Sequence, residues 1–70
     1  MDESGFVLAS SGTKTGRFCC ISALADSNVD FVGAGSTPNA TSLAIPKLFE
    51  LEGIFTSVTV NSGSVVLYLA

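Results

Sequence analysis

The amino-acid sequence predicts an all-β protein, a small β-sandwich or barrel of about five to six short strands with a C-terminal β-hairpin, which is oligomeric. Short apolar runs rich in β-branched and aromatic residues alternate with turn-forming residues about every eight to twelve positions. The chain has only 70 residues, of which 47% are hydrophobic and 13% are charged. A chain of this composition is too apolar to be disordered and too short to bury a large core of its own.

Residues 1–16 are expected to form an N-terminal arm with one candidate short strand at residues 5–9. The first four residues include two acidic ones, Asp2 and Glu3, and residues 10–16 combine low hydrophobicity with two glycines, which favours an extended segment over a packed element. We expect this arm to become ordered mainly on contact with a partner. Residues 17–70 are expected to form a single small β domain.

The middle of the chain predicts short strands separated by polar turns and loops. The apolar run of residues 17–25 favours a strand through its Phe-Cys-Cys-Ile centre, although its periodicity alone also admits a helix. Two further short strands are expected at residues 29–32 and 43–45, and the second ends at Pro46, which lacks an amide donor. Residues 47–52 are compatible with a helical turn or with an extended connection, and the sequence does not distinguish the two.

The C-terminal residues predict a β-hairpin. Residues 53–60 alternate as a strand, with Phe55 and Val58 on opposite faces, and Asn-Ser-Gly at residues 61–63 is a turn signal. The returning strand, residues 64–70, is apolar on both faces, which is typical of a strand inside a layered structure or against another subunit. We therefore expect the interface with another subunit or with a larger partner to include the following side chains: Phe55, Val66, Tyr68 and Leu69.

The small size of the chain requires a source of stability beyond its own core. A disulfide is not expected, because Cys19 and Cys20 are adjacent and neighbouring side chains on a strand point to opposite faces. A tetrahedral zinc site is not expected either, since the chain has no histidine. Self-association into a homo-oligomer is therefore the predicted source of stability.

Charge and hydropathy also exclude two classes of partner. Three basic residues and a net charge of −3 do not provide the positive surface that nucleic-acid binding requires. Residues 53–70 carry no charge, but serine, threonine and asparagine interrupt the apolar run, so we expect no membrane span. The acidic residues 1–4 differ from the basic start of a secretory signal, so export is not expected.

No sequence motif predicts catalysis or cofactor binding. The Gly-Thr-Lys-Thr-Gly stretch at residues 12–16 departs from the spacing of a phosphate-binding P-loop, and Gly-Ala-Gly at residues 33–35 is a lone pair of glycines in a loop. The closest pairs of carboxylates are Asp26 with Asp30 and Glu50 with Glu52, and the chain has no histidine that could serve as a general base for a serine or cysteine nucleophile. We therefore expect no enzyme activity, no catalytic, cofactor-binding or metal-binding residues, and no cofactor.

A series of short motifs follows Arg17 in a distinctive order. It contains Phe-x-x-Ile-x-x-Leu-x-Asp-Ser at residues 18–27, a Gly/Ser/Thr loop, Ile-Pro at residues 45–46, GIFTSV, NSGSVV and a closing Tyr68. This order, across residues 17–68, resembles a group of very short structural proteins of tailed-bacteriophage virions. The group often has a glycine soon after the proline, whereas residues 47–52 here are more apolar and acidic.

The resemblance implies a structural protein present in many copies in the virion. Its most direct reading is a small capsid decoration or cement protein, assembled in the host cytoplasm, that binds the major capsid protein, stabilises the shell and forms a homotrimer. One alternative is a head-fibre, tail or baseplate accessory protein. A second alternative, of a different class, is a cytoplasmic binding module that acts on a host protein and is not packaged.

Overall fold

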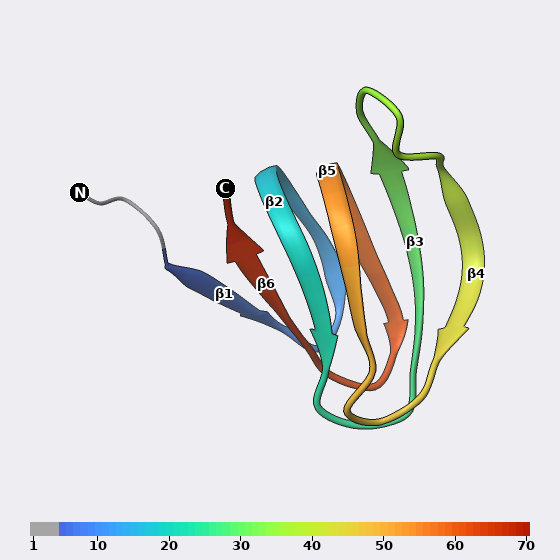
Figure 1. Ribbon diagram of the computed structural model, residues 1–70. Helices are drawn as coiled ribbons and strands as arrows, with labels where there is room; N and C mark the ends of the chain where they lie inside the picture. Colours follow the sequence, from blue (N-terminus) through green and yellow to red (C-terminus); the bar gives the residue numbers. More distant parts are fainter. Residues whose placement is uncertain (1–4) are drawn as a thin grey trace.

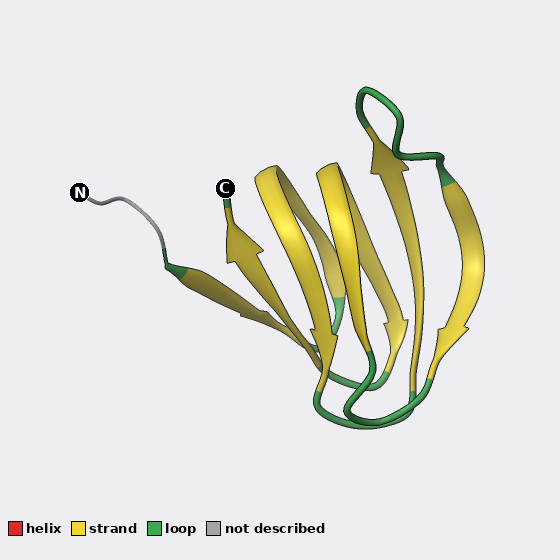
Figure 2. Ribbon diagram, viewed as in Figure 1, coloured by secondary structure: helices red, strands yellow, loops and turns green. Residues whose placement is uncertain are grey.

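Six strands account for the alternating apolar and polar segments of the chain (Figure 1). The structure, a computed structural model, describes residues 5–70, and Figure 2 shows strands joined by loops throughout this part. The strands are β1 (Phe6–Ala9), β2 (Gly12–Ala23), β3 (Ser27–Gly33), β4 (Ala40–Ile45), β5 (Glu50–Ser62) and β6 (Val65–Leu69). Residues 5–70 contain no helix with the length and hydropathy needed to cross a membrane.

The six strands form one open antiparallel sheet in the order β1-β6-β2-β5-β3-β4. The edge strands β1 and β4 lie at opposite sides of the molecule in Figure 1. The long central strands β2 and β5 curve strongly, so that the sheet turns back on itself (Figure 1). The all-β prediction is therefore confirmed, and the sheet is open rather than closed into a barrel.

The curvature divides the sheet into two halves that share β2 and β5. The β1 half consists of β1, β6, residues 18–23 of β2 and residues 50–55 of β5. The β4 half consists of β3, β4, residues 12–15 of β2 and residues 55–62 of β5. Buried side chains from both halves join in a single hydrophobic cluster. A small antiparallel sheet obtains a two-sided core in this way, because each half covers the apolar face of the other.

β-Bulges allow the two central strands to bend. The pairing of β2 with β5 shifts register on both sides of Phe18, and the pairing of β3 with β5 shifts next to Gly33. An extra residue in one strand changes the face on which the following side chains lie. Phe55 and Val58 consequently both lie in the core, with exposed fractions of 1% and 0%. The prediction that these two side chains occupy opposite faces is therefore wrong.

The structure also replaces the predicted C-terminal hairpin with a different connection. A short turn joins β5 to β6, but β2 lies between them, and β6 pairs with β1 and β2. Gly63 in this turn has a φ of 90°, and the N–H of Ser64 donates to Ser27 Oγ at 3.1 Å. The turn thereby carries the chain from the β4 half to the β1 half. The full burial of Val65 and Leu67 there, rather than the turn residues, selects the neighbours of β6.

The segment expected to be an N-terminal arm is mostly strand. β1 confirms the candidate strand near residues 5–9, whereas residues 12–16 belong to β2, and this part of β2 pairs with β5. The hydroxyls of Thr13 and Thr59 form a hydrogen bond of 2.8 Å across the pair. The expected boundary between residues 16 and 17 therefore falls inside a strand, because β5 supplies backbone partners to that segment. Residues 1–4 of the expected arm lie outside the described residues.

Neither of the two segments that the sequence left open between helix and extended chain is a helix. The apolar run of residues 17–25 is strand as far as Ala23, as expected. Residues 47–52 begin with a tight turn, in which Leu48 has a φ of 72° and the N–H of Phe49 donates to the carbonyl oxygen of Pro46 at 3.1 Å. β5 starts directly after this turn.

Candidate functional site

The outer face of the β1 half is apolar along β1 and β6, although this part of the surface is open to solvent. Side chains that are paired in register across a sheet lie side by side on one face. Two such rows cross this half: Phe6, Tyr68, Cys20 and Glu52 form the first, and Leu8, Val66, Ser22 and Glu50 form the second. We call the four residues that begin these rows the apolar outer face: Phe6, Leu8, Val66 and Tyr68.

Three of these four side chains are substantially exposed. Leu8 is 63% exposed, Phe6 60% and Tyr68 40%, whereas Val66 is buried, with an exposed fraction of 7%. The rings of Phe6 and Tyr68 contact each other at a tilt of 59°, with centroids 6.3 Å apart, which is a favourable aromatic arrangement. Contiguous apolar side chains on a surface mark sites of interaction. The apolar outer face is therefore the candidate functional surface of this protein.

The apolar outer face arises because β1 and β6 carry apolar residues in both phases of their alternation. Val65 and Leu67 are fully buried on the inner side of β6, so Val66 and Tyr68 point outward. β1 repeats this pattern, with Val7 paired to Leu67 on the inner side. The inner phase of each strand is covered by the core, and the outer phase lies on the outer surface of the sheet, where Phe6, Leu8 and Tyr68 stay exposed although Val66 is buried.

Acidic residues border the apolar outer face on the side of β5. Cys20 pairs with Tyr68 on one side and with Glu52 on the other. Burial raises the pKa of the Cys20 thiol above its ordinary value, and the carboxylates of Glu50 and Glu52 raise this pKa further. The thiol is therefore protonated at neutral pH, which makes it a poor nucleophile. The surface combines an apolar centre with a negatively charged border.

Of the four interface residues predicted from the sequence, the structure brings two together. Val66 and Tyr68 lie on the apolar outer face. Leu69 is partly buried and packs against the core. Phe55 is 1% exposed, and its ring packs edge to face against Phe31 with centroids 4.8 Å apart. The assignment of Phe55 to an interface is therefore wrong, because the bulge beside it turns its side chain into the core.

Sequence reasoning missed the contribution of β1 to this surface. The alternation of Phe6, Val7 and Leu8 indicates a strand with an outward apolar phase. Only the pairing of β1 with β6 places Phe6 beside Tyr68 and Leu8 beside Val66. The hydrophobic pattern was present in the sequence, but it does not identify the neighbouring strand.

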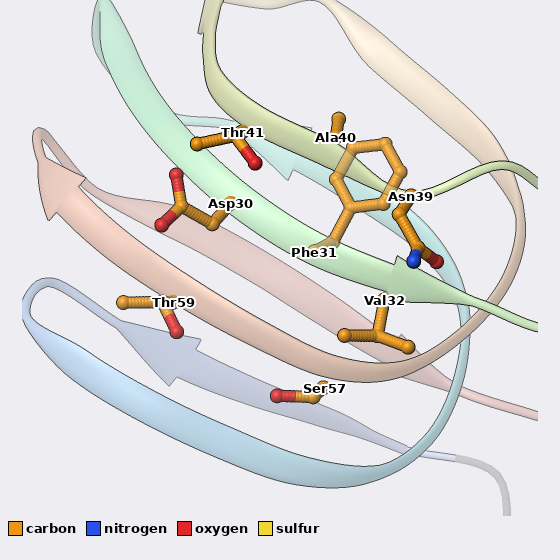
Figure 3. A pocket seen from close by; sticks show the side chains of 8 residues that line it. All are labelled: Asp30, Phe31, Val32, Asn39, Ala40, Thr41, Ser57 and Thr59. Atoms are coloured by element: carbon orange, nitrogen blue, oxygen red, sulfur yellow. The ribbon is translucent and has the colours of Figure 1, made fainter.

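The outer face of the β4 half is mostly polar, although the exposed Val32 also lies on it. An open hollow of about 190 Å³ lies there between β3, β4 and β5 (Figure 3), lined by Asp30, Phe31, Val32, Asn39, Ala40, Thr41, Ser57 and Thr59. Asp30 Oδ1 accepts hydrogen bonds from the N–H of Ser42 at 2.6 Å and from Asn61 Nδ2 at 3.0 Å. These bonds, the first above all, lower the pKa of the Asp30 carboxyl. A general acid requires the opposite shift.

The other residues singled out in the sequence have structural roles. Residues 12–16 form part of a strand, so their N–H groups do not converge as they do in a phosphate-binding loop. The N–H of Gly33 donates to Asn39 Oδ1, and Asp26 Oδ1 accepts from the N–H of Lys47, each at 2.9 Å. Both cysteines are free thiols. Within residues 5–70, no three His, Cys, Asp or Glu side chains are grouped closely enough to hold a metal ion.

Comparisons with protein-family models, with curated proteins and with solved structures each find no match to this chain. Among the described residues, the apolar outer face is the arrangement best suited to bind another macromolecule.

Proposed function

We propose that this protein is a structural component of a tailed-bacteriophage virion, a small capsid decoration or cement protein that binds the major capsid protein and stabilises the shell. The apolar outer face is the main support for the proposal, because the fold leaves three of its four apolar side chains, Phe6, Leu8 and Tyr68, exposed on paired strands. The resemblance of residues 17–68 to virion proteins supports the choice of partner.

Burial of the apolar outer face against a capsid surface provides the driving force for binding. Complete burial of one large apolar side chain contributes about 1.5–3 kcal/mol relative to full exposure. Phe6, Leu8 and Tyr68 each begin between 40% and 63% exposed, so each contributes a fraction of that value. One such contact is modest, but a shell that binds many copies gains it at every site, which is how a small protein can stabilise a large assembly.

Rigid presentation and charge give the contact its specificity. Phe6, Leu8 and Tyr68 project from two paired strands rather than from loops, so little conformational entropy is lost when they bind. Glu50 and Glu52 border the surface, and the chain carries a net charge of −3. A complementary capsid surface therefore has an apolar centre and basic residues on one side, and salt is expected to slow the association.

Mass spectrometry of purified particles tests the location of the protein. A decoration protein should appear in roughly tens to hundreds of copies per particle, as the symmetry of the shell requires. Only a few copies per particle would instead assign the chain to a fibre, tail or baseplate. Recovery solely as a soluble complex with a host protein would assign it to the cytoplasmic class. Either result would overturn the proposal.

A substitution on the apolar outer face tests the binding surface. Tyr68→Ala is expected to weaken binding to undecorated shells by about tenfold, which corresponds to about 1.4 kcal/mol. Val32→Ala is the matched control, because Val32 is 46% exposed but lies on the β4 half. Equal binding by both variants, measured by co-sedimentation with shells, would show that another surface of the protein contacts the capsid.

A further inference from the structure

β1 has a free edge whose hydrogen-bonding groups can be identified. The carbonyl oxygen of Gly5 accepts from the N–H of Leu69 at 2.8 Å. Residues of an antiparallel pair exchange hydrogen bonds at every second position, so Val7 also faces β6 and the backbone groups of Phe6 and Leu8 face away. Among residues 5–70, β1 pairs with β6 alone. Two N–H groups and two carbonyl groups are thus available to another strand.

This edge lacks most of the features that keep edge strands apart. Proteins protect free edges with charged side chains, with proline or with local distortions of the strand. β1 consists of Phe6, Val7, Leu8 and Ala9, and it contains no charge, no proline and no residue with positive φ. Its one protective feature is that it is short, which limits the strength of any pairing.

The other edges of the sheet are protected. β4 is distorted at Ser42, which has a φ of 51° and donates its N–H to Asp30, and Pro46 follows the strand. The part of β2 that β6 does not reach carries Lys14, and Gly12 at its start has a φ of 76°. A head-to-tail assembly needs two different compatible edges. β5 also has an edge at residues 50–53 that β3 does not reach, and this edge carries Glu50 and Glu52. Within residues 5–70, β1 alone lacks such features, so its compatible partner is the β1 strand of a second copy.

We propose that two copies of this chain associate through their β1 strands, which pair antiparallel about a two-fold axis at Val7. In this register Phe6 of each copy exchanges hydrogen bonds with Leu8 of the other, which makes four hydrogen bonds. Val7 faces Val7 of the second copy in the intervening position. The two sheets then become one continuous sheet.

Side chains and charge agree with this register. Phe6 and Leu8 point to the same face, so each Phe6 lies beside Leu8 of the second copy on the outer surface. Neither β1 nor β6 carries a charged residue, and the acidic residues Glu50 and Glu52 lie on β5, two strands beyond β6. The two-fold axis therefore brings no like charges of these strands together, although the chain is acidic overall.

The inference goes beyond the proposed function and does not depend on it. The two-fold pair places two apolar outer faces side by side and so enlarges the surface available to a capsid. It also differs from the homotrimer that the virion resemblance implies, because a self-paired edge closes with two subunits. Oligomeric state in solution tests the pairing, whereas particle composition tests the function, so either can fail alone.

Sedimentation of the isolated protein across about 1 µM to about 1 mM is expected to show a monomer–dimer equilibrium. Leu8→Pro is expected to abolish the dimer, because it removes a donor on the free edge while leaving the hydrogen bonds to β6 in place. Leu8→Ala is the matched control, since it keeps the N–H and should still dimerise. Circular dichroism establishes that both variants remain folded.

A cross-linking variant tests the register directly and does not depend on the folding of the proline variant. Val7→Cys, with Cys19 and Cys20 replaced by serine, is expected to form a disulfide-linked dimer, because its Cα atoms would lie about 4.5 Å apart. Phe6→Cys on the same background should link poorly, because residue 6 faces residue 8 and its Cα atoms exceed the bridging limit of about 7 Å.

A wild-type protein that stays monomeric over the whole range, or that forms trimers, would overturn the inference. So would a dimer in which Val7→Cys links no better than Phe6→Cys. Two results together would establish the pairing: the Leu8→Pro variant is folded but no longer dimerises, and Val7→Cys forms the cross-link whereas Phe6→Cys does not.

Discussion

The hydroxyl of Ser27 holds two turns of the molecule together. Ser27 is a buried polar residue, and its Oγ donates to the carbonyl oxygen of Ala25 at 2.7 Å while accepting from the N–H of Ser64 at 3.1 Å. Ser27→Ala leaves both groups without this partner, and an unsatisfied buried group costs about 1–3 kcal/mol. We expect a loss of stability of that size, measured as the free energy of unfolding in urea.

Ser62→Ala is the control for this substitution. Ser62 also lies near the turn between β5 and β6, but it is exposed, so its removal is expected to change stability by less than about 0.5 kcal/mol. Equal losses in the two variants would show that the Ser27 hydrogen bonds contribute nothing specific.

Asp30 makes stability depend on pH at the residue scale. Hydrogen bonds from the N–H of Ser42 and from the side chain of Asn61 lower the pKa of its carboxyl in the folded protein. A lowered folded-state pKa contributes stability above the unfolded-state pKa, and this contribution is lost as the pH falls through the folded-state pKa. The effect is small, because the carboxyl is exposed to solvent.

The stability of the wild type relative to Asp30→Asn is therefore expected to decrease as the pH falls from about 6 to about 2. Urea unfolding of both proteins at several pH values measures this difference. A difference that stays constant over the range would show that the carboxylate form of Asp30 makes no contribution.

At the scale of elements, the turn between β5 and β6 determines how β6 reaches the β1 half. Gly63 has a φ of 90°, and a Cβ atom at this position would overlap Ser27 Oγ and the carbonyl oxygen of Asp26. Gly63→Ala is therefore expected to cost more than the about 1–2 kcal/mol that a positive φ imposes on a residue with a side chain. The thermal unfolding midpoint measures this cost.

Gly35→Ala separates the two contributions. Gly35 has a φ of 61°, but a Cβ atom there would contact nothing within 4 Å, so only the conformational cost applies. If Gly63→Ala and Gly35→Ala lower the unfolding midpoint equally, the close packing of the two turns is unimportant.

At the scale of the whole molecule, Phe55 lies where β5 passes from the β1 half to the β4 half. Its ring is buried and packs against the ring of Phe31, which lies on β3 in the β4 half. Phe55→Ala is expected to cost about 3–5 kcal/mol, which is much of the about 5–15 kcal/mol that holds a small domain together. We expect a largely unfolded chain, or a strongly lowered midpoint in urea.

Ser57→Ala is the matched control on the same strand. Ser57 lies on the polar outer face of the β4 half and lines the hollow there (Figure 3). The Ser57→Ala substitution is expected to change the free energy of unfolding by less than about 0.5 kcal/mol. A folded Phe55→Ala protein with the midpoint of Ser57→Ala would show that the core does not depend on this contact.

Local properties of the chain were sufficient to predict the all-β class and the approximate positions of most strands. β-Branched and aromatic runs favour extended backbone, and Gly, Pro, Asn and Asp interrupt it, so both signals act over a few neighbouring residues. The same local pattern identified half of the candidate surface, because a strand apolar in both phases, such as that of Val66 and Tyr68, must leave one phase uncovered.

Pairing between distant residues decided the rest. The alternation of apolar residues in β6 is compatible both with a hairpin to β5 and with pairing beside β2. The burial of Val65 and Leu67 in a common core selects the pairing beside β2. The bulges that turn Phe55 inward, and the register that brings Phe6 beside Tyr68, likewise depend on partners far away in the chain. The alternation of apolar residues predicts which side chains share a face of the sheet, but it does not predict which strand lies next to them.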